Sequence, residues 1–221
     1  MRQSDDEKGE IKMGCDIHLF AETKRYRHDD ERRENGVWIS ADKWSVNEEK
    51  ALYQVNSTID NNWHFHVADD DKVYKGRNYD LFAILAGVRN YNKLTPISYP
   101  KGLPDDVCMA IKKEHDCWED NAHSQSYVTL KELLAYDWKK EMLFMAKART
   151  KEQAIHIFGD KIVETHDTTT GVNVHYLTTL AERTGNFMET IEKLKVLQQY
   201  SNNLYHQVNE EDIRIVFWFD S

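Results

Sequence analysis

Cysteine, proline and glycine are scarce in this sequence. The 221 residues include nine glycines, three prolines and three cysteines, and none of Cys15, Cys108 and Cys117 belongs to a Cys-x-x-Cys pair. This pattern argues against a secreted disulfide scaffold and against a zinc ribbon. The low glycine and proline content excludes a collagen-like or low-complexity chain.

A basic surface and a long apolar run are also missing. The formal net charge is −9, whereas a protein that grips duplex nucleic acid usually carries a basic face. The most basic stretch, residues 139–151, is explained as well by the solvated side of a helix. No apolar run approaches the roughly 20 residues that span a bilayer, and residues 1–8 are too polar for a signal peptide. We therefore expect a cytoplasmic protein whose partners include neither duplex nucleic acid nor a membrane.

Apolar residues are abundant and follow strand-like patterns at both ends of the chain. Hydrophobic residues make up 40% of the sequence, which is enough to bury a core. After residues 1–9, which read as a disordered tail, a period of two predicts a long strand, and Asn35-Gly36 predicts a turn into a partner strand at 37–39. Residues 213–219 are apolar on both faces, as central strands are. The two terminal strands are expected to pair within one sheet.

Helical patterns occupy the middle of the chain. Helix-forming periodicity or N-capping residues predict helices at 78–90, at 104–117, after Thr129, after Thr150, and at 174–199 with a break at Gly185. The predicted fold is α+β, with a single domain over residues 10–221. In it, a mainly antiparallel sheet containing both terminal strands packs against several helices, and residues 136–209 are a candidate helical insertion.

Two pairs of side chains have the spacing of metal ligands. Asp16 and His18 lie two apart on a predicted strand, so both project from one face and could hold a divalent metal. The alternative is a polar strand face on which Asp16 bonds to His18 or to a neighbouring strand. His64 and His66 have the same spacing, and there an exposed face beside an acidic loop is the preferred interpretation.

Two further segments carry groups that suit a phosphate or a nucleobase. Arg77 and Asn78 precede a predicted helix and could present a guanidinium and an amide to a ligand, with Tyr79 stacking a base. The competing interpretation makes Asn78 an N-cap and Arg77 a surface ion-pair residue.

The second of these segments is expected to be a loop at a helix N-terminus. It contains His123, Ser124 and Ser126, which could bind an anion there or make ordinary loop hydrogen bonds. Ser126 lies in no Gly-x-Ser-x-Gly elbow, so a serine hydrolase is disfavoured.

Six sequence blocks occur together in a fixed order. They are Met13–His18, Arg77–Phe82, Ala86–Asn90, Gly102–Val107, His123–Tyr127 and Ile215–Asp220. Together they resemble a widespread family of small bacteriophage proteins that begin Met-Gly-Cys-Asp-Ile-His and mostly lack an assigned activity. The resemblance covers parts of residues 13–135 and the last strand. It implies a protein of an infected bacterial cell, and it implies that the separated polar blocks meet in one pocket.

Two functional hypotheses follow, and whether the protein is an enzyme stays open between them. The first is a homo-oligomeric accessory protein that binds a nucleotide-derived small molecule and sequesters a host anti-phage immune signal, by analogy with other viral proteins. Its phosphate would lie on Arg77 and the His123–Ser126 segment, and its base on Tyr79 or Trp38. The alternative is a phosphoesterase in which Asp16, His18 and His123 hold a divalent metal that activates water.

Overall fold

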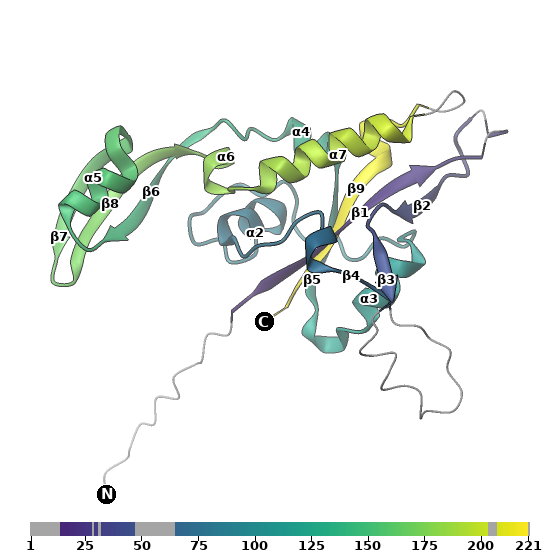
Figure 1. Ribbon diagram of the computed structural model, residues 1–221, viewed down its shortest axis with the longest axis horizontal. Coiled ribbons are helices and arrows are strands. Elements are labelled where there is room, and N and C mark those ends of the chain that lie inside the picture. Colours follow the sequence, from purple (N-terminus) through teal and green to yellow (C-terminus); the bar gives the residue numbers. More distant parts are fainter. Residues whose placement is uncertain (1–13, 28, 31, 47–64, 203–206, 221) are drawn as a thin grey trace, which may run out of the picture.

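A four-stranded antiparallel sheet forms the centre of the molecule. The computed structural model describes residues 14–27, 29–30, 32–46, 65–202 and 207–220 (Figure 1). The strand order is β2-β1-β9-β5, and the strands are β1 (Asp16–Arg25), β2 (Val37–Ser40), β5 (His123–Thr129) and β9 (Ile213–Asp220). β1 pairs with β9 from Asp16 opposite Asp220 to Thr23 opposite Ile213. The α+β class and the pairing of the terminal strands are thus confirmed.

The two faces of this sheet are covered by different elements. Leu19, Phe217 and Phe219 project into a core shared with helices α2 (Tyr79–Ala86), α4 (Leu130–Ala135) and α7 (Phe187–Ser201). Phe20 and Trp218 project the other way and pack with α3 (Met109–Asp116) and the hairpin of β3 (Trp44–Val46) with β4 (Phe65–Val67). Because β9 contributes apolar side chains to both cores, all its residues from Ile213 to Phe219 are buried.

A second, three-stranded sheet occupies one end of the molecule (Figure 1). Its strand order is β6-β8-β7, and the strands are β6 (Glu141–Ala148), β7 (Ile162–Thr168) and β8 (Gly171–Thr179). Helix α5 (Lys151–Phe158) lies between β6 and β7 in the sequence, and helix α6 (Leu180–Arg183) follows β8. The expectation that residues 136–209 form a helical insertion is therefore wrong for β6, β7 and β8, whose 8, 7 and 9 residues form a sheet. Leu143 and Met145 are exposed on β6, so this strand has apolar residues on both faces and lacks the alternation by which strands are recognised.

Helix α2 joins the two sheets. Its Leu81, Phe82 and Leu85 pack on the central sheet, while Ala83 and Ile84 pack against Phe144, Tyr176 and Leu180 of the second sheet and α6. An eight-residue helix buried on two sides needs apolar residues nearly all round, which explains why seven of its residues are buried. The N-terminal end of α2 therefore lies where both parts of the structure meet.

Local signals predicted the starts of helices better than their lengths. The capping box of Thr129 with Glu132 and the N-cap at Thr150 are confirmed. The helix break expected at Gly185, whose φ is 59°, is also confirmed, because this residue lies between α6 and α7. The helix expected from residue 104 begins instead at Met109, after a turn in which Val107 donates to the Pro104 carbonyl. Short 3-10 helices cover Asp69–Asp71, Glu119–Asn121, Gly159–Lys161 and Glu210–Asp212.

Two remaining expectations concern the tail and membranes. The predicted tail, residues 1–9, and His64 lie outside the described residues. Among the residues that are described, no helix has the length and apolar character needed to cross a bilayer.

Candidate functional site

A polar cavity of about 350 Å³ opens at the start of α2. This volume is near the lower end of the range of small-molecule sites. The residues that line it are Arg77, Asn78, Tyr79, Asp80, Tyr91, Asn92 and Arg183. Three of them, Arg77, Asn78 and Tyr79, were predicted as ligand-binding residues. The other four come from α2, from the loop after it, and from α6 of the distant second-sheet segment.

Asn78 builds the wall of this cavity through two hydrogen bonds. Its Oδ1 accepts from the Leu81 backbone N–H at 3.0 Å and caps α2, as the N-cap interpretation requires. Its Nδ2 donates to the Arg183 carbonyl at 2.8 Å. Asn78 therefore ties α6 to the start of α2, and both polar groups of its amide are already engaged.

Arg77 lies at the rim and pairs with Asp16. Its Nε donates to Asp16 Oδ1 at 2.7 Å and its Nη2 to Oδ2 at 2.5 Å, and both side chains are about half exposed. These hydrogen bonds hold the pKa of Asp16 below its usual range. A Cβ at position 14 would lie 2.4 Å from Nη1 of Arg77, so Gly14 allows the guanidinium to cross the chain there. Nη1 makes no hydrogen bond within the described part of the chain.

The second arginine of the cavity is held more firmly. Arg183 forms an ion pair through Nε and Nη2 with Asp80, at 2.8 Å for Nε, and its Nη1 donates to the Tyr176 hydroxyl at 2.8 Å. Asp80 also accepts from Asn92 Nδ2 at 2.6 Å. Two guanidinium groups are thus matched by two carboxylates, and an anionic ligand must compete with Asp16 for Arg77.

Two tyrosines give the cavity an aromatic edge. The Tyr79 hydroxyl accepts from the Cys15 backbone N–H at 3.4 Å, and its ring meets that of Tyr91 edge-on with centroids 6.2 Å apart. Tyr91 is 63% exposed, so its ring is open to a planar ligand. Arg89 interacts with Tyr91 and Cys15, and both interactions raise the Arg89 pKa.

The predicted metal pair of Asp16 and His18 has protein partners instead. His18 Nε2 lies 3.2 Å from Asp220 Oδ2, and its ring packs on Trp118 at 3.9 Å between centroids. Asp16 binds Arg77 through its carboxylate and donates its backbone N–H to Asp220 Oδ1 at 2.9 Å. Within the described ranges, neither residue belongs to a group of three side chains spaced to hold a metal ion.

The segment from His123 to Ser126 is the start of a strand and not a loop. His123 pairs with Phe219 of β9, near the end of the sheet that contains Asp16, and a register shift follows at Ser124, whose φ is 53°. His123 Nδ1 and Ser124 Oγ are 3.0 Å apart, and the imidazole ring stacks on Phe219. Neither side chain lines the cavity. Ser126 is fully buried and accepts from the Lys101 backbone N–H, so the expectation that it binds a ligand is wrong.

Trp38 lies far from the cavity and is structural. It is opposite Lys24 on β1, which is eight residues, or about 26 Å of extended strand, from Asp16. Its indole is 7% exposed, donates from Nε1 to Asp106 at 2.9 Å, and is covered by the Arg214 guanidinium 3.8 Å from the ring centroid. The expectation that Trp38 stacks a base is therefore corrected, because its ring already has a partner.

Comparisons with protein-family models, with curated proteins and with solved structures found no match to this chain.

Proposed function

We propose that the cavity at the start of α2 binds a small phosphate-bearing aromatic molecule of the nucleotide type and does not cleave it. The supporting observation is that a cationic group with a free donor, Arg77, and an exposed aromatic ring, Tyr91, share one polar cavity of about 350 Å³. A phosphate and a base need these two kinds of group side by side.

Arg77 is the residue proposed to take the phosphate. Its Nη1 donor is unused within the described residues, and a ligand that displaces Asp16 gains Nε and Nη2 as well. Charge-assisted, forked hydrogen bonds to phosphate are stronger than neutral ones. The Asp16 pair that would be broken is half exposed, and ion pairs at the surface contribute little.

Tyr91 is the residue proposed to stack the base. Stacking of a base on an aromatic side chain is worth about 1–3 kcal/mol and tolerates any base. Asn92 follows it in the chain, and its Nδ2 donates to Asp80. Its Oδ1 has no hydrogen bond within the described residues, and we propose that it accepts one from the ligand. In the proposed arrangement the base stacks on Tyr91 and the phosphate binds Arg77, and both of these residues line the cavity.

The character of the lining residues supports binding over hydrolysis. Among the described residues no histidine, cysteine or serine lines the cavity, and its one carboxylate, Asp80, is already engaged by Arg183 and Asn92. A general base or nucleophile for attack on a phosphate is therefore not set free there. Together with the resemblance to bacteriophage proteins, this favours sequestration of a host nucleotide signal. The cavity is small for a dinucleotide, and we propose that a second copy of the chain completes the enclosure of a larger ligand.

A thermal-shift titration of the purified protein tests this proposal. We expect AMP, ADP-ribose or a cyclic dinucleotide to raise the melting temperature. A ligand at 100 times its Kd adds about 2.7 kcal/mol, or about 5–11 °C for a chain of this size. Chromatography of the same mixtures should recover the ligand intact, whereas a cleaved product would favour the phosphoesterase alternative.

Two matched variants locate the binding. Arg77→Ala should weaken binding by about 10–150-fold, the loss of one charge-assisted hydrogen bond. Lys75→Ala removes a positive charge two residues away that pairs with Asp70 and does not line the cavity, so it should bind like the wild type. Equal weakening in both variants would refute the assignment of the phosphate to Arg77.

A further inference from the structure

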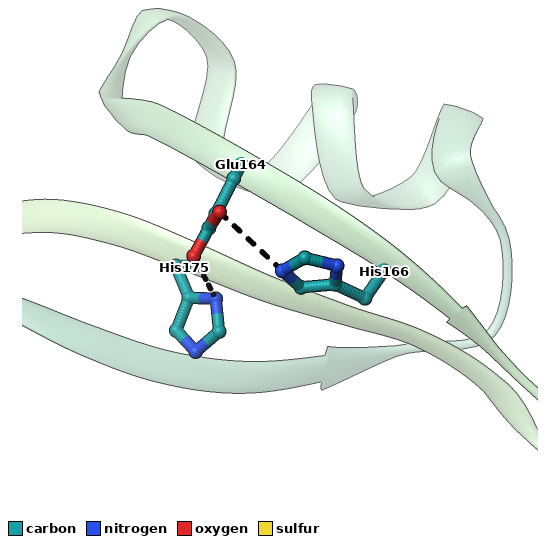
Figure 2. A group of neighbouring side chains, drawn as sticks. All are labelled: Glu164, His166 and His175. Carbon is teal, nitrogen blue, oxygen red and sulfur yellow. Dashed lines mark ion pairs between the residues drawn. The ribbon is translucent and has the colours of Figure 1, made fainter.

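Three side chains that suit a transition metal meet on the second sheet, away from the cavity. Figure 2 shows Glu164 and His166 on β7 and His175 on β8, directed toward one another. One ligand atom from each lies within 4.8 Å of the others. None of these three residues was predicted from the sequence, because Glu164, His166 and His175 do not form a recognised metal-ligand motif.

The strand geometry explains why these residues share a face. Glu164 and His166 are two apart on β7, and successive alternate residues of a strand project to the same side. His175 lies directly opposite Glu164 across the β7–β8 pair, while its neighbours Val174 and Tyr176 point into the core. A register shift between Ile162 and Glu164 sets this alignment, as bulges do where a side chain must be re-aimed.

The distances match those of ligands around one ion. Glu164 Oε1 lies 3.0 Å from His175 Nδ1, and Glu164 Oε2 lies 3.4 Å from His166 Nε2. Bonds of about 2.1 Å in a tetrahedral zinc site would hold neighbouring ligand atoms about 3.4 Å apart. His175 Nδ1 is also buried without a hydrogen-bond partner of acceptable geometry among the described residues, although it is near the carboxylate. A buried ring nitrogen in this condition calls for an explanation, and a shared ion supplies one.

We propose that Glu164, His166 and His175 bind one Zn²⁺ ion. Two imidazoles and one carboxylate are a zinc ligand set, and three protein ligands leave a fourth position for water or for a ligand from outside. The ion would join β7 to β8 on the exposed face of the second sheet. The alternative is that Glu164 forms ordinary ion pairs with the two histidines. Exposed ion pairs contribute little to stability, and in that case the protein would not bind zinc at these residues.

Isothermal titration of the full chain with ZnCl₂ tests the proposal. The protein is produced without a histidine tag and treated with a chelator beforehand. We expect one equivalent of zinc to bind and to raise the melting temperature. Titration with Co²⁺ should give an absorption spectrum without a thiolate charge-transfer band, because no cysteine belongs to the site.

Variants distinguish this site from other zinc ligands in the chain. His166→Ala and Glu164→Gln should each weaken zinc binding by at least about tenfold, since even residues that only orient a ligand cost about 10–100-fold. His156→Ala is the matched control: it removes an exposed histidine of α5 in the same segment and should leave binding unchanged. Undiminished one-to-one binding in a His166→Ala/His175→Ala double variant, or no binding by the wild type, would overturn the proposal.

Discussion

The buried ion pair of Glu22 with Arg214 gives the sharpest stability prediction. These residues are neighbours in the β1–β9 register, and Arg214 Nε donates to Glu22 Oε2 at 2.6 Å with both side chains almost fully buried. Glu22 Oε1 also accepts from the Cys108 backbone N–H at 2.7 Å. Arg214→Met keeps an unbranched apolar stem, removes the guanidinium and its charge, and leaves the Glu22 carboxylate buried without its cation.

The magnitude follows from this burial. Removing one partner of a buried pair costs about 3–5 kcal/mol, which corresponds to about 6–20 °C in melting temperature for a chain of this size. The double variant Glu22→Leu/Arg214→Met removes both charges. It leaves the Cys108 N–H without its acceptor, which costs about 1–3 kcal/mol. The double variant should therefore be more stable than Arg214→Met alone.

Urea denaturation followed by tryptophan fluorescence measures both effects. The unfolding free energies of the wild type, both single variants and the double variant form a complete cycle. We predict that burial of the two charges sets the unfolding free energies of these variants. A loss of less than about 1 kcal/mol in Arg214→Met, or a double variant that is less stable than Arg214→Met, would contradict this prediction.

Three further predictions concern ligand affinity, pH and zinc. Asp16→Asn removes the competitor for Arg77 and should tighten nucleotide binding about twofold to fivefold, the range of an exposed ion pair; unchanged affinity in a thermal-shift titration would count against Arg77 as the phosphate ligand. Burial raises the pKa of Asp42 to about 6 from 3.8, so between these values the folded chain holds a proton that the unfolded chain loses. The unfolding free energy of the wild type should therefore fall as the pH rises from about 4 through about 6. The unfolding free energy of Asp42→Asn, measured relative to the wild type, should accordingly rise across that window, and a constant difference would contradict this assignment. Asn173 lies opposite His166, so Asn173→His should supply a fourth zinc ligand and tighten binding about tenfold or more; calorimetric affinity equal to that of the wild type would argue against the proposed geometry.

The terminal strands were predictable because the pattern of apolar residues along each strand indicates which of its faces are buried. β9 is apolar at nearly every position and β1 alternates, so the sequence indicated a central strand and its neighbour. The second sheet was missed because β6 places Leu143 and Met145 on an exposed face, which hides its period of two. The capping box at Thr179 with Glu182 marks a helix start five residues after the point, residue 174, at which the helical stretch was predicted to begin.

The candidate site was only partly predictable, because one of its seven lining residues, Arg183, comes from a distant part of the chain. Arg77, Asn78 and Tyr79 precede or begin a helix, and that local context indicated a binding role. Arg183 lies 103 positions after Asp80, and no pattern in the sequence indicates that these two meet. Trp38 has the right chemistry for stacking, but its burial beneath Arg214 depends on tertiary packing, which a residue type alone does not reveal.

The most direct measurement is mass spectrometry of the small molecules that heating releases from protein purified out of bacterial cells. Wild-type protein and Lys75→Ala should release the same intact, phosphate-bearing aromatic compound in near-stoichiometric amounts, and Arg77→Ala should release little of it. Release of that compound in equal amounts by Arg77→Ala, or no phosphate-bearing compound from the wild type, would contradict the proposal that the cavity at the start of α2 binds a nucleotide-type ligand.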